Sequence, residues 1–400
     1  MANNDKQYPC ESLSISCEKL LKLVEEFGTL DELKILKLSA ADNQNFSQLF
    51  DKTPFPFPNL EQLNLKRCYE LSNFPESIRK LTKLKTLQLY ISDDNIELMA
   101  NICHLLPNLE NLDLSGNNKL LHLPNCVCNL SNLRTLDLSG CEGLATCPDN
   151  LDRLTSLKTL HLCANDNEKA VLENCIIQLP QLQELNLSFS NNLTKLSPLI
   201  AQLVNLEKLD LSHCLNLTEI PEDIEKLYRL KYLNLRECKK LKTLPETIGQ
   251  LPNLETLNLK TCSMLKTLPE TIGQLNRLTH LNLSECYKLS SLPDTIGQLN
   301  SLNTLNLSFC KSLTTLPENL CQLPNLEQLS LWGCRNLTAL PEDIGRLVSL
   351  KQLYLNECKS LTVFPDSISR LASNLQQISI LGCDNLNALP KGIDKDKIKL

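Results

Sequence analysis

The chain has 400 residues, of which 42% are apolar, enough for a continuous core, whereas aromatic residues make up only 4%. Its 40 basic and 46 acidic residues give a net charge of −6, which argues against a nucleic-acid partner. No stretch reaches about 18 consecutive apolar residues, so we expect no membrane span, and the start MANNDKQYPC lacks the pattern of a secretory signal.

The first predicted element lies at the N-terminus. The stretch ESLSISCEKLLKLVEEFG, at residues 11–28, has the pattern of a short strand followed by a helix. Such a unit would shield the leucines that come after it from water. We therefore assign residues 1–32 to an N-terminal cap.

A repeat with the motif LxxLxLxxC follows the cap, and we number the positions of each copy from its first leucine. That leucine stands at Leu60, Leu84, Leu109, Leu133, Leu157, Leu182, Leu206, Leu230, Leu254, Leu278, Leu302, Leu326, Leu350 and Leu375. A more divergent copy begins at Leu33, which makes 15 copies, and the step is 24 residues except for three steps of 25 and a first step of 27. A repeat of this length predicts a solenoid, because no copy can bury its leucines alone.

The residue pattern of each copy predicts the same local structure. The alternating leucines of xLxL indicate a short strand with one buried face. The second half, LxxLPxxIGxL, has a proline where a helical turn can begin and an acidic residue after it, and both suit a helix N-terminus. We expect strands of successive copies to pair in parallel in a solenoid over residues 33–393, with a polar tail at 394–400.

Copies one, three and six depart from this form in their second half. The third reads SDDNIELMANICHLLPNL and the sixth reads NDNEKAVLENCIIQLPQL. Both open with Asp or Asn residues that can cap a helix, and apolar residues at helical spacing follow. We predict full α-helices in these two copies.

The motif LPxxIGxLxxLxxLxLxxC resembles the leucine-rich repeats of plant intracellular immune receptors, and also those of effector proteins that bacteria deliver into host cells. The resemblance covers roughly Leu13 to Ile393. It implies an α/β fold: a right-handed, curved solenoid with a parallel concave β-sheet and short helical or 3₁₀ segments on the convex side.

Ten cysteines occupy position nine of the repeat. They are Cys68, Cys141, Cys214, Cys238, Cys262, Cys286, Cys310, Cys334, Cys358 and Cys383. Many members of the family have asparagine there, and cysteine can fill the same slot as a small buried residue with a weak S–H donor. The other cysteines lack the spacing of a metal site. We expect reduced, structural thiols, which indicate a reducing cytosol.

The sequence offers little catalytic chemistry. It contains none of the motifs GxxxxGK[ST], GxGxxG, HExxH and GxSxG. His161 and Cys163 lie two residues apart on one predicted strand, with Asp137 and Asp113 in the column of His161. This set could form a nucleophile, a base and an orienting acid, but an open sheet provides no oxyanion hole and does not exclude water. We expect neither an enzyme nor a bound metal or cofactor.

The predicted sheet face is formed by positions three, five and seven, with position eight at its edge. Most position-five residues are Asn, Asp or Ser, as a solvated face requires. Three groups of residues depart from this monotony and are the candidate partner-binding residues: an aromatic group of Phe309, Trp332 and Tyr354, a basic group of Arg236, Lys260 and Tyr232 next to Lys208, and an acidic group of Asp113 and Asp137. The aromatic side chains would lie within about 10 Å of each other at the spacing of parallel strands, and aromatic residues often anchor interfaces.

These patterns predict a monomeric, non-enzymatic, cytoplasmic protein that binds a partner protein through its concave face. One alternative is a bacterial effector that binds a host protein in the host cytosol. Another is an adaptor that recruits substrates to a ubiquitin ligase, although the segment before Leu33 is short for a typical recruiting domain.

Overall fold

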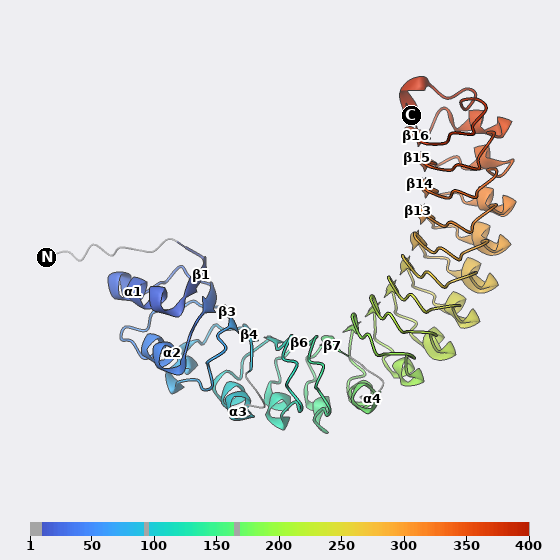
Figure 1. Cartoon of the computed structure of the whole chain (residues 1–400). Coiled ribbons are helices and arrows are strands. Elements are labelled where there is room, and N and C mark those ends of the chain that lie inside the picture. Colours follow the sequence, from blue (N-terminus) through green and yellow to red (C-terminus); the bar gives the residue numbers. More distant parts are fainter. Residues whose placement is uncertain (1–9, 92–95, 164–168, 400) are drawn as a thin grey trace. The chain divides into compact units, whose positions relative to one another are not determined.

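The computed structural model describes residues 10–91, 96–163 and 169–399. The chain divides into two compact units, Met1–Leu185 (unit 1) and Asn186–Leu400 (unit 2). In each unit a strand, a turn and a helical segment follow one another repeatedly, so that the strands line one side and the helical segments the other (Figure 1). This is the architecture of a leucine-rich-repeat solenoid, as the sequence predicts.

Unit 1 begins with a strand and helix and contains all four α-helices that the structure describes. Its elements are β1 (Ser12–Ser16), α1 (Cys17–Phe27), β2 (Ile35–Ser39), α2 (Asn43–Phe50), β3 (Gln62–Arg67), β4 (Thr86–Leu89), α3 (Ile96–Leu105), β5 (Asn111–Asp113), β6 (Thr135–Leu138), β7 (Thr159–Leu162) and α4 (Lys169–Gln178), with the 3₁₀ helices η1 (Glu76–Lys80), η2 (Asn125–Asn129) and η3 (Leu151–Arg153). β8 (Glu184–Asn186) spans the point where the sequence passes into unit 2.

Unit 2 is more regular, because its helical segments are all short 3₁₀ helices. Its strands are β9 (Lys208–Asp210), β10 (Tyr232–Asn234), β11 (Thr256–Asn258), β12 (His280–Asn282), β13 (Thr304–Asn306), β14 (Gln328–Ser330), β15 (Gln352–Tyr354), β16 (Gln377–Ser379) and β17 (Ile398–Lys399). Its 3₁₀ helices are η5 (Pro198–Gln202), η6 (Glu222–Lys226), η7 (Glu246–Gln250), η8 (Glu270–Gln274), η9 (Asp294–Gln298), η10 (Glu318–Gln322), η11 (Ile344–Arg346), η12 (Asp366–Leu371) and η13 (Lys395–Lys397).

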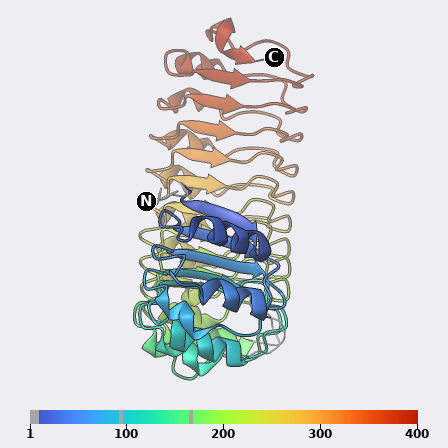
Figure 2. The ribbon, with the colours of Figure 1, turned by 90° about the vertical axis from the view of Figure 1, so that its left-hand side faces the viewer.

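The strands of each unit pair in parallel with like positions opposite each other. In unit 2, for example, Leu257 of β11 lies opposite Leu281 of β12, which lies opposite Leu305 of β13. Figure 2 shows the strands of unit 2 following one another in one direction. The leucines at positions four and six are buried, with Leu281 only 1% exposed. The buried ladder of leucines predicted by the alternation is confirmed.

The second half of the common repeat forms a 3₁₀ helix whose proline lies just outside it. Pro245 and Pro269 occupy the N-cap positions of η7 and η8, and an acidic residue stands in the first turn of each. Gly249, at the end of the IG pair, has no room for a side chain because the backbone carbonyl of Thr271 in the next copy lies against it. The glycine therefore lets successive helical segments pack closely.

The two α-helices predicted from the divergent copies are confirmed as α3 and α4. The Asp and Asn residues expected to cap them fall mostly within 92–95 and 164–168, which lie outside the described residues. A further helix, α2, was not expected from the sequence. The side chain of Asp42 caps it by accepting a hydrogen bond from the backbone N–H of Asn45 at 2.8 Å.

The two ends of the repeat array carry additional strands. β1 pairs with β2 at the N-terminal end, as expected for the predicted cap, and α1 follows β1 directly. At the C-terminal end, the segment predicted as a polar tail contributes β17, which pairs with β16. Among the described residues, no helix combines the length and the apolar character that a membrane crossing requires.

Candidate functional site

An Asn or Asp at position five closes the end of its strand. Its side-chain oxygen accepts a hydrogen bond from the backbone N–H two residues later, at 2.8–3.1 Å, in nine copies. The accepting residues are Asn64, Asp113, Asp137, Asn186, Asp210, Asn234, Asn258, Asn282 and Asn306. The short side chains of Asn and Asp suit this local hydrogen bond to the backbone. Position five is therefore a structural column as well as part of the polar face.

The cysteines at position nine tie each copy to the one before it. In all ten, Sγ donates to the backbone carbonyl of position six of the preceding copy, over 2.9–3.5 Å. Asn117 occupies position nine in one copy and donates to the equivalent carbonyl, that of Leu89, at 3.1 Å. The prediction that cysteine fills an asparagine slot is confirmed. All 19 cysteines lie among the described residues, and none of them forms a disulfide.

Position eight adopts a left-handed backbone conformation in most copies. The residues with positive φ at this position are Ala40, Gly116, Gly140, Phe189, His213, Glu237, Thr261, Glu285, Phe309, Gly333, Glu357 and Gly382. Glycine adopts this conformation without strain, whereas each other residue pays a steric penalty. The turn directs the side chains of position eight along the edge of the sheet.

Position seven differs from the prediction that it faces outward in every copy. Ser212, Ser284 and Ser308 are buried, because the chain is already turning and their short hydroxyls remain near the sheet. Ser284 donates its hydroxyl to the side chain of Asn282 at 2.8 Å. Large side chains at the same position extend outward: Trp332 is 43% exposed and Leu381 is 60% exposed.

Two of the three predicted aromatic residues are in contact. The rings of Phe309 and Trp332 lie with their centroids 5.7 Å apart. Gly333 follows Trp332, and any side chain there would collide with the Phe309 ring, so this glycine makes room for the pair. Tyr354 is half-buried on β15, and no ring contact joins it to the pair in the described part of the chain.

The predicted basic group is partly neutralised. Arg236 lies 3.6 Å from the carboxylate of Glu237, and Lys260 lies 3.2 Å from that of Glu285. Tyr232 is half-buried on β10, opposite Lys208 of β9. Burial, with the nearby Asp210 carboxylate, raises the pKa of Tyr232.

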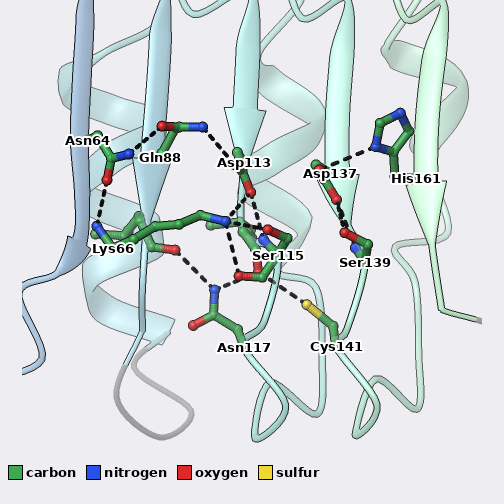
Figure 3. A network of polar contacts seen from close by, with 12 residues as sticks. Asn64, Lys66, Gln88, Asp113, Ser115, Asn117, Asp137, Ser139, Cys141 and His161 are labelled. Atoms are coloured by element: carbon green, nitrogen blue, oxygen red, sulfur yellow. Dashed lines mark hydrogen bonds and ion pairs between the residues drawn. The ribbon is translucent and has the colours of Figure 1, made fainter. Parts of the chain in front are cut away.

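The predicted acidic group is engaged within unit 1 (Figure 3). Asp113 forms an ion pair with Lys66 at 2.9 Å and accepts from Gln88 at 2.8 Å. Asp137 lies 3.2 Å from Nδ1 of His161 and accepts from the hydroxyl of Ser139 at 2.6 Å. The carboxylates therefore have partners from neighbouring strands, and their part in binding a protein stays a prediction.

The pair of Asp137 and His161 shifts both pKa values. The hydrogen bond with Asp137 raises the pKa of His161, against the opposing effect of burial. Burial alone would raise the pKa of Asp137, but the hydrogen bonds from His161 and Ser139 lower it. Of the residues considered as a possible catalytic set, the structure thus brings His161 and Asp137 together. In the described residues, no group of three or more His, Cys, Asp or Glu side chains is arranged to hold a metal.

The sequence placed position eight at the edge of the sheet, but two residues of this edge, Phe189 and His213, were missed. There the ring of Phe189 stacks on that of His213, with centroids 4.4 Å apart and planes 5° from parallel. His213 in turn lies 3.5 Å from the carboxylate of Glu237. A signal for this conformation was present in the sequence, because four copies have glycine at position eight.

Comparisons with known proteins agree with this geometry. Residues 193–334 match a family described as "Leucine-rich repeat region", and residues 56–249 match one described as "Disease resistance protein RPS4B-like, leucine-rich repeats". This chain is a leucine-rich-repeat protein. The TMV resistance protein N of Nicotiana glutinosa is 34% identical over 137 residues, an alignment that covers 28% of this chain and 12% of that protein. The match therefore covers only a small part of the length of this relative.

Solved structures extend the likeness over nearly the whole chain. A leucine-rich-repeat protein of Leptospira interrogans is 28% identical with a TM-score of 0.58, covering 98% of this chain and 96% of that one. A chain of the glycosylated Toll–Spatzle complex of Drosophila reaches a TM-score of 0.69 at 20% identity, covering 87% of this chain and 46% of that one. At that identity the second likeness shows the fold alone.

The first prediction concerns position five. Asn282→Ala should lower the free energy of unfolding by about 1 kcal/mol, because the backbone N–H of Ser284 loses its acceptor. Asn282→Asp should have a smaller effect, since aspartate accepts the same bond in other copies. Leu281→Ala, which empties a buried site, should cost about 2–5 kcal/mol. Chemical denaturation measures all three, and an Asn282→Ala protein as stable as the unchanged chain would contradict the assignment.

The second prediction concerns pH. A raised histidine pKa stabilises the folded state fully below the unfolded pKa of about 6.5, and the contribution is lost as pH rises through the folded pKa. The unfolding free energy lost in His161→Gln should therefore be larger at a pH of about 5.5 than at about 8.5. A loss that does not change with pH would show that His161 and Asp137 are not coupled in this way. His122→Gln is the control, because His122 contacts a threonine hydroxyl.

The third prediction concerns thiol reactivity. Hydrogen bonding from the neighbouring thiol of Cys103 lowers the pKa of Cys126 to about 7, whereas burial raises the pKa of Cys286 and of Cys334 to about 12. Thiolate is the reactive form. In folded protein at neutral pH, iodoacetamide should label Cys126 before Cys286 and Cys334, as peptide mass spectrometry can show. Equal labelling of Cys126, Cys286 and Cys334 would contradict this account.

Proposed function

We propose that this protein is a non-enzymatic scaffold that binds a partner protein through the outward face and edge of its sheet. The single observation that carries the proposal is the contact between Phe309 and Trp332. Trp332 is the only tryptophan of the chain, and it is 43% exposed at a position that holds a small serine in the two preceding copies. An exposed aromatic pair of this kind offers apolar area that a partner can bury.

Several features support the setting of this proposal. The 19 cysteines, none of which forms a disulfide, suit a reducing compartment, so we propose a cytoplasmic location. The match to the leucine-rich repeats of disease-resistance proteins supports a recognition role of the repeats.

A second candidate is a bacterial effector that binds a host protein in the host cytosol. The likeness to a bacterial protein, that of Leptospira, extends over 96% of that chain at 28% identity and supports the bacterial source that this candidate requires. In both settings the binding surface would be the same. The third hypothesis, a ubiquitin-ligase adaptor, gains no support from the described residues.

The fourth prediction tests the binding surface. Trp332→Ala and Tyr354→Ala should each weaken the complex about thirtyfold, the effect of losing roughly 2 kcal/mol at an interface anchor. The partner would first be captured from an extract with the full chain, identified by mass spectrometry and purified for calorimetric titration.

The control is Glu270→Ala, which changes an exposed residue of η8 on the helical side. It should leave the affinity unchanged, and circular dichroism should show that all three variants fold. Unchanged affinity in both aromatic variants, with a loss in Glu270→Ala, would move the binding surface to the helical side.

A further inference from the structure

Positive charge gathers along one edge of unit 2. Positions seven to thirteen of six consecutive copies, those that begin at Leu230 to Leu350, form the turn that follows each strand. These turns contain ten basic residues, which we call the basic edge: Arg236, Lys239, Lys240, Lys242, Lys260, Lys266, Lys288, Lys311, Arg335 and Lys359. The same turns contain three acidic residues, Glu237, Glu285 and Glu357. The surplus of basic residues is local, since the whole chain has a net charge of −6.

The helical segments of the same six copies have the opposite charge. Their PxxIGx stretches contain seven acidic residues, namely Glu246, Glu270, Asp294, Glu318, Glu342, Asp343 and Asp366, against the two arginines Arg346 and Arg370. These segments lie on the side away from the strands (Figure 1). Charge is thus separated within unit 2, and a negatively charged ligand would be attracted to the basic edge and repelled from the helical side.

The three acidic residues of the turns neutralise only part of the basic edge. Glu237 lies 3.6 Å from both Arg236 and Lys239. Glu285 pairs with Lys260 at 3.2 Å, and Glu357 pairs with Arg335 at 2.6 Å. These pairs hold four of the ten cations in place.

The other six cations have no ion-pair partner within the described residues, and all six are exposed. They are Lys240, Lys242, Lys266, Lys288, Lys311 and Lys359. The ammonium group of Lys311 lies 4.9 Å from the centre of the Tyr287 ring, which is also exposed. These six cations come from five of the six copies, and together they are complementary to carboxylates along an extended chain.

The backbone at position eight gives a second, independent reason to regard this edge as a binding surface. Glu237, Thr261, Glu285, Phe309 and Glu357 all have φ between 57° and 62°. Gly333 adopts the same conformation within the same row without strain. Side chains held in a strained conformation where glycine would fit indicate that the side chains themselves are needed. Here they position the cations beside them or, as in Phe309, form the contact with Trp332.

We propose that the basic edge binds an acidic segment of a protein partner, and that an apolar side chain of this segment packs on Phe309 and Trp332. This inference rests on the proposed function and specifies the chemistry of the partner. A polyphosphate is the less favoured ligand, because the net negative charge of the chain and its acidic helical side repel a large polyanion. An extended acidic peptide needs to contact only the basic edge.

The fifth prediction uses three probes with the full chain: fluorescein-labelled poly-L-glutamate, a labelled random copolymer of glutamate and tyrosine, and a labelled oligothymidylate of matched charge. Fluorescence anisotropy at low salt should show that poly-L-glutamate binds to the chain. Added salt should weaken this binding. Lys266→Glu combined with Lys288→Glu should weaken this binding about tenfold. Trp332→Ala should weaken the binding of the copolymer and leave the affinity for poly-L-glutamate unchanged.

The matched control is Arg229→Glu combined with Arg277→Glu. It changes the net charge of the chain by the same amount at two exposed positions outside the turns. This variant should bind poly-L-glutamate within about twofold of the unchanged chain. An equal loss in both double variants would overturn the proposal in favour of a general effect of net charge. Tighter binding of oligothymidylate than of poly-L-glutamate would overturn it in favour of nucleic acid.

The captured partner separates this inference from the proposed function. If Trp332→Ala weakens the partner's binding and the Lys266→Glu, Lys288→Glu variant binds as the unchanged chain does, the acidic-segment inference fails and the proposed function stands. If both variants bind the partner with unchanged affinity, the proposed function fails. Losses in both variants would support the two together.

Discussion

A turn follows each strand at the same point of the repeat. The rest of the structure depends on the hydrogen bonds that close this turn. Position five accepts the N–H of position seven, and the thiol of position nine donates to the preceding copy, as Asn282 and Cys286 illustrate. These bonds satisfy backbone groups that would otherwise be buried without partners. They also hold the leucines of successive copies in register.

Because the turn is fixed by its backbone, it leaves a few side chains free for other tasks. Position eight projects along the edge of the sheet in a left-handed conformation, and glycine would be sufficient there for the fold. Where the chain has Glu237 or Phe309 instead, it accepts strain. The same turn that builds the solenoid therefore also presents the charged and aromatic residues that we assign to recognition.

Much of the fold could be predicted from the sequence. The spacing of the leucines specified the parallel strands, and helical spacing specified α3 and α4, because both patterns are local. Two features of the turn could not be predicted as readily. The internal partners of Asp113 and Asp137 come from Lys66 and His161 on other strands, and long side chains select such partners only in the folded chain. The left-handed backbone at position eight depends on bonds between copies, although the glycines at this position indicated it.

Hydroxyl-radical footprinting of the full chain with its captured partner tests most directly the claim that the turn edge is the recognition surface. Tyr287 and Trp332 on the edge, and Tyr228 and Val348 outside the turns, are all exposed in the free protein and can serve as probes. The account predicts that partner binding lowers the oxidation of Tyr287 and Trp332 and leaves Tyr228 and Val348 unchanged. Protection of Tyr228 and Val348, with Tyr287 and Trp332 still oxidised, would contradict it.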